Sequence, residues 1–248
     1  MKLSAAILTK NSKGIIGALI DNLSFCDEVV VVDDFSEDGT DIVARQHDAK
    51  VLKRQLNGNF AKQRNYALDN CSGEWILFVD SDENVSEDLK KEILTAVKSN
   101  TISGYQIKRS NQFLGKTLKY GEAGTVKLIR LARKNSGKWE RNVHEYWNVK
   151  GKIGKLKECL NHNPYQSLGE FIEKINTYSS MHAKANFKEG KKSSILKIAF
   201  YPGMKFLSNY IFKKGFLDGI HGFVFALLMS IHSFLAWSKL WIMQTKIK

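Results

Sequence analysis

Two runs of bulky apolar residues, each followed at once by acidic residues, constrain the fold of this chain more than any other feature. The sequence EVVVV at residues 28–32 precedes two aspartates, and WILFV at residues 75–79 precedes an Asp-Ser-Asp triplet. Apolar runs of this length are typical of strands that are buried on both faces of a sheet. In open α/β sheets, ligands bind outside the carboxyl ends of the strands, which is where these aspartates lie.

Strand-like and helix-like patterns alternate through the first hundred residues. Apolar runs at residues 3–9, 28–32, 50–53 and 75–79 are separated by helical stretches, and a further amphipathic stretch covers residues 87–97. This alternation predicts an α/β fold with a Rossmann-type sheet flanked by helices. Shorter strand patterns with glycine-centred turns follow, which predict a β-rich cap on one end of the sheet and a first domain of residues 1–160. The rest of the chain, residues 161–248, has helical patterns.

The net charge of +13 is concentrated in the C-terminal part of the chain. Residues 1–150 carry 23 Lys and Arg against 20 Asp and Glu, whereas residues 151–248 carry 15 against 5. A basic segment that also contains phenylalanine and tryptophan fits two kinds of partner, nucleic acid or an anionic membrane surface. The segment has no zinc motif, RNA-binding signature or arginine-rich run, so we favour the membrane and expect no nucleic-acid partner.

Apolar side chains and lysines are mixed in the predicted C-terminal helices, which we expect to form an amphipathic extension. The apolar members are Ile195, Ile198, Phe200, Tyr201, Met204, Phe206 and Leu207, and the lysines are Lys191, Lys192, Lys197, Lys205, Lys213 and Lys214. In such helices, apolar side chains enter the headgroup boundary while each lysine near anionic lipid contributes about 1 kcal/mol. Residues 222–237 are the most apolar stretch but are short for a span of about 20 residues, so we expect them to lie in the interface.

The cysteines and the N-terminal sequence bear on the compartment. Cys26, Cys71 and Cys159 are odd in number and lack metal-type spacing, as expected for reduced thiols. Residues 1–9 form an apolar run with no cleavage-site pattern behind it, so we expect no secretory signal. With the basic extension, this predicts a cytoplasmic protein bound peripherally to the inner face of the cytoplasmic membrane.

The triplet Asp80-Ser81-Asp82 is the strongest candidate for a metal site. Two carboxylates one residue apart, at the end of a buried strand, can supply hard oxygen ligands to one Mg²⁺ or Mn²⁺ ion. Such an ion bridges the phosphates of a nucleotide-sugar and stabilises the charge that develops as the diphosphate leaves. The structural alternative is a solvated loop that caps the next helix, since Ser86 is a good N-cap residue.

Asp33, Asp34 and Arg64 are candidate ligands for the nucleotide. A carboxylate at the end of a strand can accept hydrogen bonds from a base N–H or from ribose hydroxyls. Arg64 lies in a predicted helix between the two acidic strand ends, and an arginine fork matches the geometry of phosphate. The structural alternatives are a turn for the aspartates and a solvated helix charge for the arginine. The first strand is not followed by a G-x-G-x-x-G sequence, which argues against an NAD-linked dehydrogenase.

Four segments together resemble the inverting family 2 glycosyltransferases, and the resemblance implies their GT-A fold, a Rossmann-type mixed sheet flanked by helices. The segments are ILTKN, VVVVDDFSEDGT, AKQRNYAL and WILFVDSDENV, and they occur in the same order as in that family. The residues to which the resemblance gives a role are Thr9, Asp33 and Arg64 for the nucleotide, and Asp80 and Asp82 for ribose and metal. Phe35 is a departure, because glycine is common at its position.

An inverting transfer needs a general base next to the acceptor hydroxyl, opposite the leaving diphosphate. The sequence RNVHE at residues 141–145 offers Glu145 as this base, with His144 to orient it or to approach the metal and phosphates. Arg130, in LIRLARK, is a candidate ligand of the diphosphate. The RLARK and VHE segments and the C-terminal helices resemble the β-1,4-glucosyltransferases that act on lipopolysaccharide core heptose.

The sequence therefore predicts a metal-dependent inverting hexosyltransferase. The narrower resemblance implies transfer of glucose from UDP-glucose to a lipopolysaccharide core or a related cell-surface glycan. Transfer to another surface polysaccharide or to a lipid-linked intermediate stays open, because selectivity depends on a few pocket contacts. A basic nucleic-acid-binding protein is the alternative from a different class.

Overall fold

The computed structural model describes residues 2–142, 144–162 and 167–245. The chain divides into two compact units: the first consists of Met1–Arg109 and Lys127–His162, and the second of Ser110–Val126 and Asn163–Lys248. The segment Ser110–Val126 is thus grouped with the C-terminal helices, which no pattern in the sequence indicates. The boundary after residue 160 stays a prediction about functional domains.

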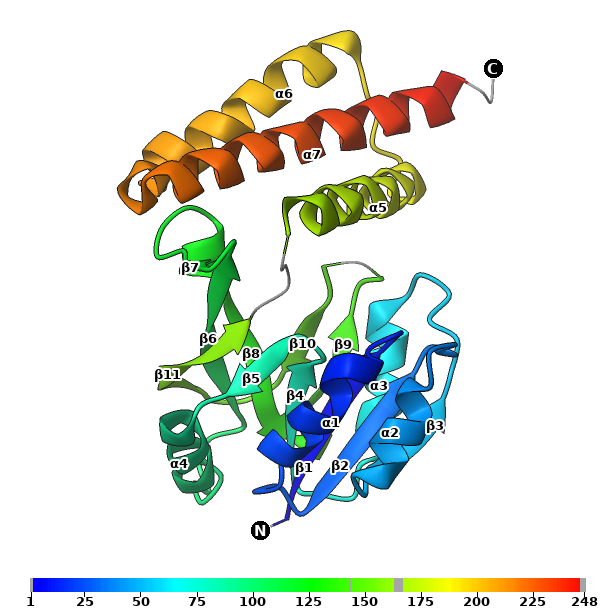
Figure 1. Ribbon diagram of the computed structural model, residues 1–248, viewed down its shortest axis with the longest axis vertical. Helices are drawn as coiled ribbons and strands as arrows, with labels where there is room; N and C mark the ends of the chain where they lie inside the picture. Colours follow the sequence, from blue (N-terminus) through cyan, green and yellow to red (C-terminus); the bar gives the residue numbers. More distant parts are fainter. Residues whose placement is uncertain (1, 143, 163–166, 246–248) are drawn as a thin grey trace. The chain divides into compact units, whose positions relative to one another are not determined.

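One mixed sheet forms the centre of the first unit, with strand order β3-β2-β1-β4-β8-β6-β11-β5 (Figure 1). The strands are β1 (Leu3–Thr9), β2 (Glu28–Asp33), β3 (Lys50–Lys53), β4 (Trp75–Asp80), β5 (Glu83–Val85), β6 (Gly104–Phe113), β8 (Lys127–Arg133) and β11 (Ile153–His162). Strands β3, β2, β1 and β4 are parallel, whereas β8 runs antiparallel to β4 and β6, and β11 to β5. The carboxyl ends of β1, β2 and β4 therefore meet at one edge, as the sequence predicts.

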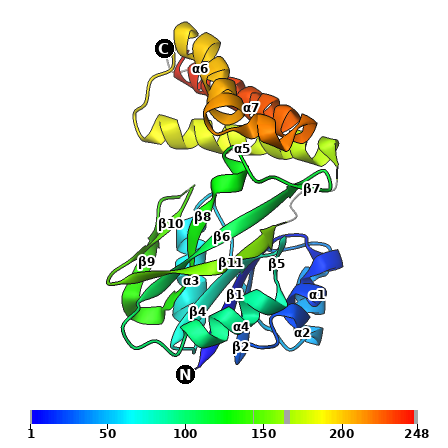
Figure 2. The ribbon, with the colours of Figure 1, turned by 90° about the vertical axis from the view of Figure 1, so that its left-hand side faces the viewer.

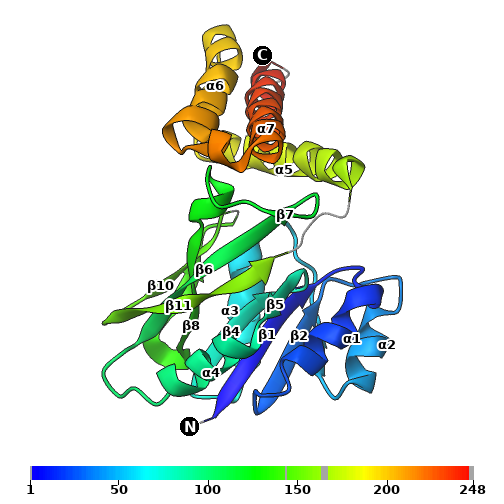
Figure 3. The same cartoon turned by 60° about the vertical axis from the view of Figure 1, so that its left-hand side comes forward.

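Side chains of the parallel strands point alternately to two faces, and helices cover both. The helices are α1 (Lys13–Asn22), α2 (Thr40–Gln46), α3 (Phe60–Asn70) and α4 (Glu87–Ala96). Ile7, Val31 and Leu77 join one buried cluster with residues of α1, α2 and α4. Their neighbours Ala6 and Phe78 join a second cluster with residues of α3, which lies on the opposite side of the sheet (Figure 3). This two-sided burial explains why the strands are apolar without a break.

A two-stranded hairpin, β9 (Gly137–Glu140) and β10 (Tyr146–Val149), packs on the α3 side of the sheet. Trp139 and Trp147 lie opposite one another in its register and stack with ring centres 5.4 Å apart. Both rings contact Phe78 of β4 edge-on. Asn65 of α3 holds the hairpin through hydrogen bonds to the backbone N–H and C=O of Trp139, both 2.9 Å long. The hairpin turn, which carries the predicted base, is therefore anchored to the strand that ends in Asp80.

The second unit is mainly helical, as predicted. Its elements are β7 (Lys116–Thr117), η1 (Ala123–Thr125), α5 (Leu168–Lys188), α6 (Ile195–Leu207), η3 (Ser208–Phe212), η4 (Gly215–Asp218) and α7 (Ile220–Thr245). Helices α6 and α7 form an antiparallel pair, and α5 packs against α7 (Figure 2). Within the described ranges, α7 is the helix that is long and apolar enough to cross a membrane by length and composition. It extends beyond the predicted apolar stretch 222–237 at both ends.

Candidate active site

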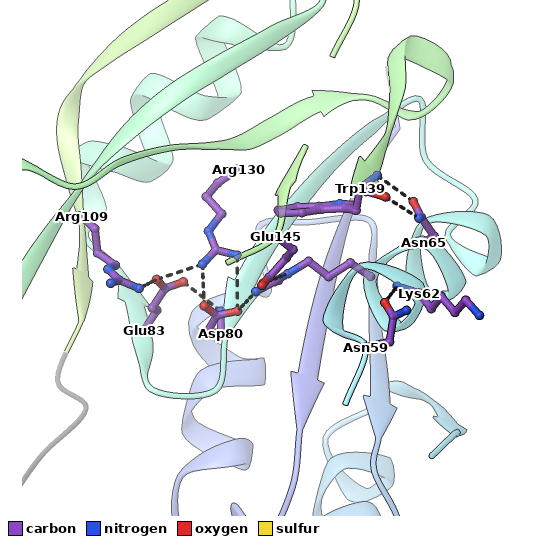
Figure 4. A network of polar contacts seen from close by, with 10 residues as sticks. Asn59, Lys62, Asn65, Asp80, Glu83, Arg109, Arg130, Trp139 and Glu145 are labelled. Carbon is purple, nitrogen blue, oxygen red and sulfur yellow. Dashed lines mark hydrogen bonds and ion pairs between the residues drawn. The ribbon is translucent and has the colours of Figure 1, made fainter. Parts of the chain in front are cut away.

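Asp80, at the carboxyl end of β4, is held by two buried arginines. Arg64 Nη2 donates to Asp80 Oδ1 at 2.8 Å, and Arg130 Nη2 donates to Asp80 Oδ2 at 2.5 Å. Figure 4 shows Arg130 above the Asp80 carboxylate, with Glu83 on one side of it and Glu145 on the other. Burial alone would raise the pKa of Asp80, but Arg130 and Arg64 outweigh it and hold this pKa well below its usual range. Asp80 is therefore an ionised anchor for two guanidinium groups.

The second partner of Arg64 is Glu145, the predicted base. Arg64 Nε donates to Glu145 Oε1 at 2.8 Å, and the Arg64 side chain is only 5% exposed. The guanidinium lies over the Trp139 ring, 4.7 Å from its centre, which fixes its plane. Arg64 thus joins the end of β4 to the hairpin turn. The sequence predicts that Arg64 binds the nucleotide, and it gives no indication that Arg64 positions Glu145.

Glu83 and Arg109 complete this network, and no sequence pattern indicated either residue. Glu83 of β5 is fully buried; its Oε2 accepts from the Asp80 backbone N–H at 2.9 Å. Its Oε1 lies 3.7 Å from Arg130 and 3.8 Å from Arg109. Burial raises the pKa of Glu83 to about 7, against the opposing effect of Arg130. Glu83 lies in the sequence DENV at residues 82–85, where no motif distinguishes it from a solvent-exposed acid in a loop.

Asp82 and His162 lie side by side, and both are of types that can bind a divalent metal ion. Strands β5 and β11 pair with Glu83 opposite His162, which brings the imidazole beside Asp82. His162 Nε2 lies 3.4 Å from Asp82 Oδ1, and the Asp82 side chain is 28% exposed. Carboxylate and imidazole are ordinary ligands of Mn²⁺ and similar ions. Asp82 and His162 are 80 positions apart in the sequence, which explains why sequence patterns did not pair them.

Few of the described side chains beside Asp82 and His162 are candidate metal ligands. Among the described residues, no group of three or more His, Cys, Asp or Glu side chains is arranged to hold a metal. A bound ion would therefore need further oxygen ligands, which the phosphates of a nucleotide can supply. Both Asp80 oxygens accept hydrogen bonds from arginines here, so its part in a metal site stays a prediction.

Thr9, Asp33 and Asp34 lie together at the ends of β1 and β2. Thr9 is buried, and its Oγ1 finds no hydrogen-bond partner among the described residues, which leaves a hydroxyl for a ligand. Asp33 is fully buried and accepts hydrogen bonds from the Ser36 N–H and hydroxyl. Asp34 accepts from the Leu56 N–H at 2.9 Å. Asp33 thus orders the loop after β2, and Asp34 joins that loop to the one after β3. The contact of either residue with a nucleotide stays a prediction.

Phe35 and His144, both near the site, have left-handed backbone conformations. Phe35 has a φ of 50° and is 52% exposed. Glycine adopts this φ at little cost, which accounts physically for the glycine expected at this position. His144 has a φ of 55° and is exposed, directly after Val143, which lies outside the described residues. The predicted role of His144 beside Glu145 therefore stays a prediction.

Comparison with known proteins places this chain in a family. The model of glycosyl transferase family 2 matches residues 4–155. An uncharacterized glycosyltransferase of Rickettsia typhi is 30% identical over 253 residues, covering 96% of this chain and 86% of that protein. The lipopolysaccharide core biosynthesis glycosyltransferase LpsC of Rhizobium meliloti is 29% identical over 252 residues. The alignment covers 97% of this chain and 92% of LpsC.

Solved structures show the same fold. Staphylococcus aureus TarS in complex with UDP-GlcNAc aligns with a TM-score of 0.50 at 20% identity, covering 94% of this chain and 81% of that one. Glucosyl-3-phosphoglycerate synthase from Mycobacterium tuberculosis, with Mn²⁺, UDP and glucosyl-3-phosphoglycerate, gives 0.50 at 18% identity and covers 78% and 81%. The predicted GT-A-like mixed sheet with flanking helices is confirmed. Because the family model covers more than half of the chain and the Rickettsia relative nearly all of it, this protein belongs to glycosyl transferase family 2 and is a glycosyltransferase.

Proposed function

We propose that this glycosyltransferase moves a hexose, with inversion, from a UDP-sugar to a lipopolysaccharide core or a related cell-surface glycan. The observation that carries the proposal is the chain Asp80–Arg64–Glu145, which couples the end of β4 to the candidate base. The likeness to LpsC, which is named for lipopolysaccharide core biosynthesis, supports the acceptor class. UDP-glucose is the donor that the narrower sequence resemblance favours.

The donor is held at the carboxyl edge of the parallel strands in this proposal. Thr9, with its unpartnered hydroxyl, and Asp33 lie on the nucleoside side. Asp82 and His162 would hold a Mg²⁺ or Mn²⁺ ion, which when bound neutralises charge on the diphosphate leaving group. The structure of a family relative with Mn²⁺ and UDP supports this choice of ion. Arg130 adds a buried positive charge to the same edge.

Glu145 acts as the general base in this proposal. In the part of the chain that the structure describes, Arg64 holds its Oε1, so Oε2 is available to accept a proton. The acceptor hydroxyl gives its proton to this oxygen while its own oxygen bonds to the anomeric carbon. The bond from that carbon to the diphosphate breaks, and the electron pair leaves with the diphosphate. Attack opposite the leaving group inverts the anomeric centre.

The acceptor and the cellular location of the enzyme are the less specific parts of this proposal. Transfer to a different surface polysaccharide or to a lipid-linked intermediate uses the same donor chemistry. We place the enzyme on the inner face of the cytoplasmic membrane, because its C-terminal part is basic and apolar. A nucleic-acid-binding role now has the basic charge alone in its favour, and membership of the transferase family weighs against it.

Donor hydrolysis by the purified protein tests the proposal. A panel of nucleotide-sugars with Mn²⁺ or Mg²⁺ should show slow release of UDP, fastest for the true donor. With a lipopolysaccharide-core acceptor, NMR of the product should show an anomeric configuration opposite to that of the donor. Retention of configuration, or no preference for any UDP-sugar, would contradict the proposal.

A further inference from the structure

Helix α6 is apolar, yet it buries none of its 13 residues. Leu196, Phe200 and Met204 are 68%, 66% and 59% exposed, and they follow one another at the i, i+4 spacing that places them in one stripe. Exposed apolar residues continue through the π-helical segment η3 that directly follows the helix, at Ile211 and Phe212. We call these five residues the α6 stripe. A soluble monomer rarely exposes so long an apolar surface.

The lysines of α6 are turned away from the α6 stripe. Lys197 Nζ donates to the Lys192 carbonyl at 2.7 Å and lies 5.2 Å from the centre of the Trp237 ring. Lys205 Nζ pairs with Glu122 at 2.6 Å. Further lysines, Lys213 among them, follow directly after the stripe. The stripe is therefore uncharged along α6 and bordered by positive charge.

Positive charge predominates around the stripe, where Glu122 and Glu189 each pair with one of the lysines. Between residues 190 and 245 the sequence contains seven lysines and a single acid, Asp218. Asp218 is buried, and its carboxylate accepts hydrogen bonds from the backbone N–H groups of Lys119 and Tyr120. A positive border complements an anionic lipid surface. It disfavours a second copy of this chain, whose border would carry the same charge.

Helix α7 is long enough to cross a bilayer, but its neighbour α5 is not compatible with crossing. α5 contacts α7 along its middle: Phe171 packs on Phe225, and Lys239 donates to the carbonyl of Asn176 at 2.7 Å. If α7 spanned the bilayer, α5 would enter the hydrocarbon with it. The exposed charged residues of α5 are Glu170, Glu173, Lys184 and Lys188. A charged side chain at the bilayer centre costs at least about 2.5 kcal/mol.

Helix α6 is also too short to be a second span. With η3, which continues it without a break, the helix runs over residues 195–212 and covers at most about 27 Å at 1.5 Å per residue, against a hydrocarbon core of about 30 Å, and it carries Lys197 and Lys205. We infer that the second unit is a monotopic anchor: the α6 stripe inserts into one leaflet of an anionic bilayer, and α7 lies along the surface without crossing. This rests on the membrane location in the proposed function, and it specifies the inserting face and the mode of attachment.

Vesicle flotation of the full chain tests the inserting face. The variant L196E/F200E puts two charges into the stripe, and I172E puts one on α5 at a site that is 50% exposed. The parent and I172E should float with phosphatidylcholine vesicles containing phosphatidylglycerol, and more weakly with phosphatidylcholine alone. The stripe variant should bind at least about tenfold more weakly. Circular dichroism melting of all three proteins checks that the substitutions leave the fold unchanged.

Labelling of Thr245→Cys, at the exposed end of α7, with a membrane-impermeant maleimide in spheroplasts tests the mode of attachment, and the cysteine should react only after the membrane is permeabilised. Labelling in intact spheroplasts would overturn the inference in favour of a span. Unchanged flotation of the stripe variant would overturn the inserting face. A parent that stays off vesicles but sediments as a dimer, split by L196E/F200E, would assign the stripe to a second copy. UDP-sugar hydrolysis measured on the same samples separates the two proposals, because loss of the anchor should leave it intact.

Discussion

Replacing Arg64 by methionine tests whether one buried guanidinium joins the end of β4 to the candidate base. Its hydrogen bonds to Asp80 and Glu145 are both 2.8 Å long, and its side chain is 5% exposed, so solvent screens them little. Removing one partner of a buried ion pair costs about 3–5 kcal/mol. Asp80 keeps Arg130 at 2.5 Å, and Glu145 is 15% exposed. We therefore expect the free energy of unfolding to fall by about 3 kcal/mol, the lower end of that range.

Urea unfolding of the metal-free protein measures this change. Arg64→Lys keeps the charge but lacks the fork that reaches two carboxylates, so it should lose a substantial part of the same stability. Arg45→Met, at an exposed position on α2, is the matched control and should stay within about 0.5 kcal/mol of the parent. A loss below about 1 kcal/mol for Arg64→Met would refute a structural role for the Asp80–Arg64–Glu145 chain.

Three further predictions concern the metal, the nucleotide and the thiols. Asp82→Ala and His162→Ala should each abolish the part of UDP binding that depends on Mn²⁺, measured by calorimetry with and without EDTA; unchanged metal dependence in either variant would remove that side chain from the site. Thr9→Val removes a buried hydroxyl that has no partner in the described chain, so stability should hold within about 0.5 kcal/mol while UDP affinity falls about tenfold; unchanged affinity would contradict the nucleotide contact. Burial raises the pKa of Cys26 and Cys71 to about 12, so at neutral pH both thiols should react with iodoacetamide about a thousandfold more slowly than ordinary thiols until urea is added. Mass spectrometry of the labelled peptides checks this, and fast labelling of the native protein would count against it.

The parallel half of the fold could be predicted because each of its strands is recognisable from a short stretch of sequence. EVVVV and WILFV are buried on both faces, so their composition alone identifies them and the acids that follow them. The grouping of Ser110–Val126 with the C-terminal helices could not be predicted. It depends on single long-range contacts, such as the Asp218 carboxylate with the backbone of Lys119 and Tyr120, for which the sequence has no periodic signal.

The residues of the candidate site could also be predicted in part, but the contacts between them could not. Asp80, Arg64 and Glu145 were predicted separately from motifs, and the structure brings the three side chains into contact. Their connection through Arg64 was not predicted, because a motif gives residue types but not hydrogen-bond partners. His162 was missed because it reaches Asp82 only through the pairing of β5 with β11.

Single-turnover kinetics of Glu145→Gln test the central claim most directly. Glutamine keeps an oxygen for the Arg64 hydrogen bond but cannot take the proton, so transfer should slow by about 10²–10⁴-fold. Donor affinity should be unchanged. Glu140→Gln is the matched control on the same hairpin: it is exposed, bonds to Tyr146 and Asn148, and should transfer sugar at the parent rate. Transfer by Glu145→Gln at near the parent rate would contradict the assignment of Glu145 as the base.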